Sequence, residues 1–241
     1  MILLFSDFGL SGPYAGQMRT ALLSHDPGVA IVDLMHDAPR SNPRAAAYLL
    51  AALAEHMPME CVCLAVVDPG VGGNRPPVIV KAGRRYFVGP GNGLFEILGR
   101  RARDPRIWHI DWRPETMSGT FHGRDLFAPV AAMLAKGAFP QATEIGWDGP
   151  GAAWPDDLPE AIYTDGFGNV MSGLRASRMD KGGRLAVTGR VLRHARTFSD
   201  VAAGEAFWYE NSVGLAEIAV NLGSAADVLN LKPGDPVDPS P

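Results

Sequence analysis

The sequence predicts an α/β protein, with an N-terminal layered α/β domain built on a mostly parallel sheet and a small all-β C-terminal domain. Over roughly the first 145 residues, short apolar runs alternate with helical patterns, which is typical of buried strands and the helices that cover them. The stretch 146–159 then holds three glycines and three prolines, which indicates a linker. β-like runs with few helix signals follow it. These observations predict domains at residues 1–150 and 158–241.

The elements of the N-terminal domain follow from its apolar pattern. Residues 43–56 place Ala46, Leu49, Leu50 and Leu53 on one helical face, and residues 126–136 form a second helix candidate that ends at Gly137. The predicted strands are residues 2–5, 30–35, 61–67, 78–81 and 86–88.

The C-terminal part is predicted to be almost entirely β-structure. The strand-like runs are residues 160–164, 184–193, 206–210 and 215–220. The tail, residues 233–241, contains four prolines and is expected to be poorly ordered.

Composition narrows the class of protein. The 241 residues are 46% apolar and carry a net charge of −4, which disfavours nucleic acids and anionic membranes as partners. The N-terminus has no basic segment before its apolar run, and no apolar run is long enough to span a bilayer, so a cytoplasmic protein is expected. Cys61 and Cys63 are predicted to be buried, reduced thiols.

Polar residues follow the first predicted strand. In an α/β sheet ligands bind at the carboxyl ends of the strands, and Asp7 stands there in the segment Ser6–Gly9. Its carboxylate could accept hydrogen bonds from both hydroxyls of a ribose. Alternatively, Asp7 could cap the next helix.

A second polar segment, residues 66–75, runs from a strand into a glycine-rich turn with Asp68 and Arg75. It matches neither of the glycine-rich phosphate-binding patterns, so its glycines are expected to shape a turn. An ion pair in a surface loop is the structural alternative.

A third segment, residues 120–125, contains His122 just before a predicted helix. Asp125 could be the N-cap of that helix. The six histidines form no zinc-binding pattern, and no G-x-S-x-G nucleophile motif occurs, so neither a metal site nor a serine hydrolase is predicted.

Two further segments lie in the C-terminal domain. Asp165, Phe167 and Asn169 on a glycine-rich loop could hold a flat heterocycle, with the aromatic ring stacking and the amide binding its edge. A simple tight turn is the alternative, since Asp-Gly favours turns. Ser212 and Glu217 lie beside a predicted strand, where polarity alone does not assign a role.

The order of these segments resembles one family, the S-adenosyl-L-methionine hydroxide adenosyltransferases, which are relatives of halogenating enzymes that act on the same substrate. The resemblance runs from about residue 2 to residue 237. It is carried by SDFG, VVDPGVGGNR, GPGNGL, TFHGRDLFAP, DGFGN and NSVGLAEIAVNLGSA, in that order.

The resemblance implies hydrolysis of S-adenosyl-L-methionine to adenosine and L-methionine, by attack of activated water at the ribose C5′. It implies no metal and no cofactor, and a homotrimer with active sites at subunit interfaces. It implies that Asp68, Arg75 and His122 handle the water and that Asp7 binds the ribose hydroxyls. The residues implied to hold the adenine and the methionine end are Asp165, Asn169, Ser212 and Glu217.

The sequence departs from the family pattern at three places. Gly12 and Gly91 stand where the family often has acidic residues, and Ser172-Gly173 replaces an asparagine. The departures at Gly12 and Gly91 leave open a sensor that binds the ligand without turnover. A halogenating relative is a separate alternative, which would not need the Asp–Arg–His set.

Overall fold

The computed structural model describes residues 1–147, 149–180 and 182–240. The chain divides into two compact units. The first unit holds Met1–Ala51 and Met57–Ala153, and the second holds Ala52–His56 and the chain from Trp154 onward.

The first unit is built on a sheet that, within the described residues, has seven strands in the order β2-β1-β3-β5-β4-β6-β7. Strands β2, β1, β3 and β5 pair in parallel, whereas β4 is antiparallel to both β5 and β6. Because β6 therefore runs with β5, the sheet is mostly parallel, as predicted. The strands are β1 Ile2–Ser6, β2 Ile31–Met35, β3 Val62–Val66, β4 Pro77–Ala82, β5 Arg85–Pro90, β6 Arg106–Ile110 and β7 Ala142–Ile145.

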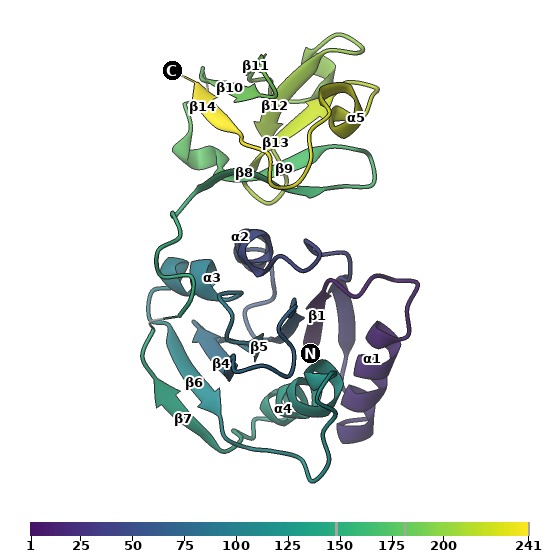
Figure 1. Ribbon diagram of the computed structural model, residues 1–241, viewed down its shortest axis with the longest axis vertical. Coiled ribbons are helices and arrows are strands. Elements are labelled where there is room, and N and C mark those ends of the chain that lie inside the picture. The colour runs from purple at the N-terminus through teal and green to yellow at the C-terminus, as the bar shows by residue number, and fades with distance from the viewer. Residues whose placement is uncertain (148, 181, 241) are drawn as a thin grey trace. The chain divides into compact units, whose positions relative to one another are not determined.

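Helices cover the two faces of this sheet (Figure 1). They are α1 Tyr14–His25, α2 Pro43–Ala54, α3 Glu96–Arg101 and α4 Ala128–Ala135. Ile2 and Leu4 of β1 pack in one apolar cluster with α1 and α4, while the alternating Leu3 and Phe5 are equally buried but lie outside that cluster. Strand alternation therefore gives each face of the sheet its own apolar layer.

The second unit, as described, contains two antiparallel sheets, in the orders β12-β13-β9-β8 and β11-β10-β14. Its strands are β8 Leu158–Thr164, β9 Val170–Arg175, β10 Arg184–Val187, β11 Arg190–Arg193, β12 Ala206–Glu210, β13 Leu215–Val220 and β14 Asp238–Ser240. One short helix, α5 Ala225–Leu229, accompanies them. Trp208 is buried in the unit's core together with Leu185 and Ile218.

Two details of the second unit correct the sequence predictions. The run 184–193 is a hairpin of β10 and β11 rather than one strand, because Thr188 and Gly189 both adopt positive φ and turn the chain. Residues 233–240 of the tail are ordered rather than loose, and residue 241 lies outside the described residues. Val237 is fully buried, which gives the proline-rich segment a contact with the core. β14 pairs with β10, which adds backbone hydrogen bonds between strands.

Cys61 and Cys63 are buried free thiols, as predicted. Among the helices of the described residues, none combines the length and the apolar character that crossing a bilayer requires.

Candidate active site

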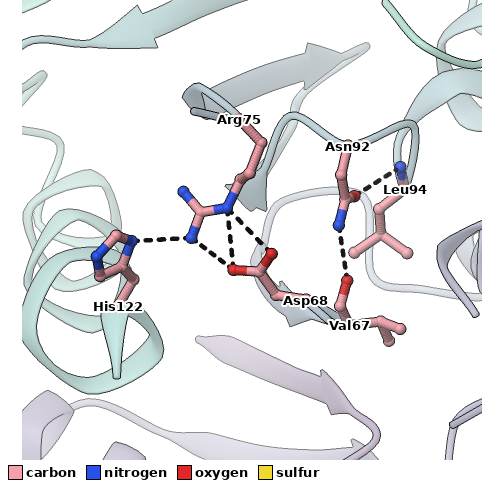
Figure 2. Close-up of polar contacts among 6 residues, drawn as sticks. All are labelled: Val67, Asp68, Arg75, Asn92, Leu94 and His122. Atoms are coloured by element: carbon pink, nitrogen blue, oxygen red, sulfur yellow. Dashed lines mark hydrogen bonds and ion pairs between the residues drawn. The ribbon is translucent and has the colours of Figure 1, made fainter. Parts of the chain in front are cut away.

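The loop after β3 and the loop that ends at His122 bring three predicted residues together. β3 ends at Val66, and the following turn, which includes Gly72 at φ +81°, carries Asp68 and returns the chain to Arg75 before β4. His122 comes from a distant loop, directly before the single π-helical turn η1, Gly123–Phe127. Single π-helical turns are frequent at functional sites. Figure 2 shows the three side chains directed toward one another.

The cluster is held by hydrogen bonds to one guanidinium. Arg75 Nε lies 3.1 and 3.0 Å from the two carboxylate oxygens of Asp68, and Arg75 Nη2 lies 2.8 Å from His122 Nδ1. The side chains of Arg75 and Asp68 are only 10% and 4% exposed. Both side chains are therefore mostly buried, unlike those of an ion pair on the surface of a loop. Arg75 also lies 5.3 Å over the ring of Phe127, which adds a cation–π contact.

These bonds determine the protonation of His122. A guanidinium only donates, so Nδ1 must accept, and the neutral ring then carries its proton on Nε2. Burial lowers the pKa of His122, and the positive charge of Arg75 lowers it further. His122 is thus a neutral ring that offers an Nε2–H donor.

Asn92 is a member of this region that the sequence analysis missed. Its Nδ2 donates to the carbonyl of Val67 over 2.9 Å, and its Oδ1 accepts from Leu94 N at 3.3 Å (Figure 2). It thereby ties the residue before Asp68 to the loop after β5. An asparagine between two glycines was the available signal in the segment GPGNGL.

Two glycines in these loops are required by close packing. A Cβ on Gly72 would lie 2.4 Å from the carbonyl oxygen of Gly119, in the loop that precedes His122. A Cβ on Gly91 would lie 2.9 Å from Pro76 O and Cγ. Gly91, one of the departures from the family pattern, therefore lies in a loop that packs against Pro76. A side chain at position 91 would push this loop away from Pro76.

Asp7 and Asp125 do not act as the helix caps considered above. Helix α1 is preceded by Pro13, and Asp7 Oδ2 instead accepts from Ser41 N at 2.8 Å. Burial raises the pKa of Asp7. Asp125 lies inside η1 and accepts from Ser118 N at 2.8 Å, which holds the loop before His122.

The predicted residues of the second unit line one cavity of about 740 Å³. This volume falls within the range of about 300–1,000 Å³ that is usual for small-molecule sites. The cavity lining is Asp165, Phe167, Asn169, Met171, Phe198, Tyr209, Asn211, Ser212, Glu217, Val220, Leu222 and Gly223. All four predicted residues of this unit are among them.

Asp165 forms the tight turn and also shapes the cavity. Its Oδ1 accepts from Phe167 N and Asn169 N, each at 2.9 Å, and its Oδ2 accepts from Asn169 Nδ2 at 3.2 Å. The turn presents the Phe167 ring, which is 83% exposed, at the cavity. The turn and the binding-loop interpretations are therefore compatible.

Glu217 lies at the base of a buried polar network. Its side chain accepts from the Tyr209 hydroxyl and, at 2.7 Å, from Asn211 Nδ2. Asn211 cannot flip, since its Oδ1 accepts from Val213 N and Leu215 N. Burial raises the pKa of both Glu217 and Tyr209. Sequence reasoning missed Tyr209 and left Asn211, which precedes Ser212, without an assigned role.

The fold and site define a class: two-unit proteins with a buried Asp–Arg–His cluster at the strand ends of an α/β unit and a ligand-sized cavity in a β unit. The family model described as the SAM hydroxide adenosyltransferase N-terminal domain matches residues 2–146, and the model of the C-terminal domain matches residues 159–238. The chain belongs to the S-adenosyl-L-methionine hydroxide adenosyltransferase family, which confirms the resemblance.

Relatives and solved structures agree with this assignment. A Thermus thermophilus protein named (R)-S-adenosyl-L-methionine hydrolase is 40% identical, with 98% of each chain covered. A Salinispora arenicola protein of the same name is 37% identical over 95% of this chain and 94% of its own. A solved structure of an uncharacterized conserved protein from Thermotoga maritima covers both chains completely at a TM-score of 0.89 and 30% identity. A second solved structure, of a conserved hypothetical protein from Thermus thermophilus, gives a TM-score of 0.78 at 38% identity, over 99% of each chain.

Proposed function

We propose that this protein hydrolyses S-adenosyl-L-methionine to adenosine and L-methionine. The observation that carries the proposal is the buried cluster of Asp68, Arg75 and His122, in a chain whose relatives are named as hydrolases of this compound. A halogenating enzyme would need a halide in place of an activated water and would have no use for such a cluster.

The substrate already contains a good leaving group, the sulfonium, and lacks a nucleophile. Forming free hydroxide from water at pH 7 costs about 12 kcal/mol. The guanidinium of Arg75 stabilises the negative charge that develops on the water oxygen. The carboxylate of Asp68 retains lone pairs beyond those bound to Arg75 and accepts the water proton.

His122 orients the reacting groups and does not act as the base. Because Nδ1 is occupied by Arg75, the ring orients the water or the substrate through Nε2–H and does not take a proton there. The oriented water attacks C5′ in line with the departing sulfur. A negative nucleophile then meets a positive leaving group, so charge is neutralised in the transition state and a dry site favours the reaction.

The ligand-holding residues divide into two kinds. Asp7 binds the ribose hydroxyls, and the exposed hydroxyl of Ser212 and the amide of Asn169 bind the adenine or the methionine end. Asp165 and Glu217 act by shaping the cavity: their oxygens already accept hydrogen bonds from the turn and from Tyr209. These assignments rest on the position of each side chain at its cavity or strand end.

The sulfonium configuration is part of the proposal. The relatives are named for the (R) form, and we assign the same form to this chain. The substrate is thus the (R) epimer at sulfur.

We further propose a homotrimer in which the water-handling cluster of one subunit and the cavity of another complete one active site. The large exposed apolar side chains of Phe167 and Leu222 both line the cavity among polar residues, and adjoining exposed apolar groups with a polar rim mark interaction sites, which supports a covering partner. Sedimentation of the purified protein tests this, and a fully active monomer contradicts it.

The reaction as written needs no metal or organic cofactor, and exhaustive dialysis against a chelator should leave turnover unchanged. A cytoplasmic location is also proposed, because the unpaired thiols of Cys61 and Cys63 suit a reducing compartment. Cell fractionation tests that location.

The hydrolysis itself is tested by incubating the purified protein with separated (R) and (S) epimers and resolving the products by chromatography. Adenosine and methionine should form in equal amounts from the (R) epimer. An Asp68→Ala preparation, purified in the same way, controls for contaminating hydrolases. Tight ligand binding without products in the wild type would instead identify a sensor.

A further inference from the structure

A second chain of polar side chains lies directly beside Asp7. Ser6 Oγ lies 2.7 Å from His36 Nδ1, and His36 Nε2 lies 3.1 Å from Asp33 Oδ1. Asp33 in turn accepts from Arg19 Nη1 on α1. Ser6 and His36 are buried, whereas Asp33 and Arg19 are exposed. This chain of hydrogen bonds therefore runs from the surface of α1 to the last residue of β1.

The protonation pattern gives this chain a direction. The carboxylate of Asp33 must accept, so His36 Nε2 donates, and in the neutral ring Nδ1 then accepts from the Ser6 hydroxyl. Ser6 resembles the serine of a hydrolytic triad, but it is fully buried, so it cannot meet a substrate. The hydrogen-bonded side chains can therefore influence only the residues around them.

Its immediate neighbour is the loop that carries Asp7. Gly9 N donates to His36 O at 2.6 Å, and Ala38 N donates to Ser6 O at 3.0 Å. The residues on both sides of Asp7 are thus tied to the loop after β2. The Asp7 carboxylate itself accepts from Ser41 N of the same loop.

Packing alone does not require this arrangement. Two apolar side chains of similar volume would fill the space of Ser6 and His36 without the cost of desolvating polar groups. What directional hydrogen bonds add is a defined backbone orientation at Asp7.

We propose that Ser6, His36 and Asp33 are positioning residues that orient Asp7 for the two ribose hydroxyls, and thereby determine ribose specificity. The inference rests on the proposed role of Asp7. A displaced carboxylate would still reach one hydroxyl but not both, so selectivity between ribose and deoxyribose should suffer more than turnover.

The test is calorimetric titration of the full protein with adenosine and with 2′-deoxyadenosine. The ratio of the two dissociation constants is measured in the wild type, Asp7→Asn, His36→Leu and Ser6→Ala. Leu22→Ala, which truncates a buried side chain of α1 outside the chain of hydrogen bonds, is the control for lost stability. Because an amide oxygen can replace Nδ1 as the acceptor for Ser6, His36→Asn is the conservative variant.

The wild type should prefer adenosine, and Asp7→Asn should lose the preference. His36→Leu and Ser6→Ala should reduce the preference about tenfold, because that is roughly what one lost hydrogen bond between a charged group and a hydroxyl is worth. His36→Asn should recover most of it, and Leu22→Ala should keep it. Should His36→Leu not fold, Ser6→Ala and Asp33→Ala, which are smaller changes, decide the question.

The positioning role would be overturned if folded His36→Leu and Ser6→Ala proteins kept the full preference for adenosine while Asp7→Asn lost it. The role of Asp7 would then remain intact. A preference that survives in Asp7→Asn would overturn both. Neither outcome affects the hydrolysis assay, which follows products rather than ribose selectivity.

Discussion

Arg75 Nη2 donates to His122 Nδ1 over 2.8 Å, and the same guanidinium binds both carboxylate oxygens of Asp68. One planar group therefore sets the orientation of the histidine ring and of the carboxylate. Because these bonds use the fork of donors on arginine, the cluster depends on the shape of the cation as well as on its charge.

Arg75→Lys should accordingly lower turnover on the order of 10²-fold, because one ammonium cannot hold Asp68 and His122 in the same geometry. Substrate affinity should change much less. Steady-state kinetics and calorimetry separate the two effects. Arg106→Lys, in an exposed pair with Glu144, is the matched control and should retain wild-type rates. Equal, near-normal turnover in both variants would mean that the cluster is structural.

Protonation of His122 should dismantle the cluster, since Nδ1–H would then face the donors of Arg75. Burial and Arg75 hold the folded pKa of His122 below the ordinary 6.5. The unfolded chain therefore binds the proton more readily, and the stability contribution, complete above pH 6.5, is lost as pH falls from 6.5 to the folded pKa.

Urea unfolding of the wild type and of His122→Asn, at steps between about pH 8 and pH 5, isolates this contribution because all other groups titrate in both proteins. The wild type should lose stability relative to the variant in the window below the ordinary histidine pKa. A difference that stays constant with pH would show that His122 is not the titrating group.

Asn92→Ala should lower turnover about tenfold with little change in KM, because it frees the Val67 carbonyl and loosens Asp68 without touching the ligand. Asn42→Ala, which removes the side-chain acceptor for Ala45 N at the start of α2, should reduce stability by about 1 kcal/mol and leave turnover unchanged. If the two variants lose turnover in proportion to their lost stability, Asn92 has no positioning role.

Glu217→Gln should weaken adenosine binding and lower the free energy of unfolding by about 1–3 kcal/mol. The amide of Asn211 is fixed as a donor, so the new side chain must turn its own NH₂ toward the Tyr209 hydroxyl. Tyr209→Phe should cost less, because it only deletes one donor, whereas in Glu217→Gln the Tyr209 hydroxyl must turn to accept from the new NH₂ and its own proton loses its acceptor. Glu205→Gln, in an exposed pair with Arg193, is the control. Unaltered adenosine affinity in Glu217→Gln would remove Glu217 from the binding cavity.

The strands could be predicted from the sequence where they are buried on both faces of the sheet. β3 is apolar throughout and was found within one residue at each end. Helix α1 was missed because, along its length, only Met18 and Leu22 are buried and the pattern is correspondingly weak. β9 was missed because Ser172 and Gly173 interrupt it. A Cβ on Gly173 would lie 2.6 Å from Leu158 Cβ, so the glycine serves close strand packing.

The sequence pattern singled out Asp68, Arg75 and His122 one by one, and only the resemblance predicted that they act together. Asp68 and His122 lie far apart in the chain, and no spacing rule joins them. Asn92 binds a backbone carbonyl, which leaves no partner side chain to detect. The network around His36 depends on which residues of two adjacent strand ends face each other, and this becomes visible only in three dimensions.

The central claim, attack of water at C5′, is tested most directly by running the reaction in oxygen-18 water and analysing the products by mass spectrometry. The account predicts one labelled oxygen in adenosine, at the 5′-hydroxyl, and no label in methionine. Label in methionine, or adenosine without label, would contradict it.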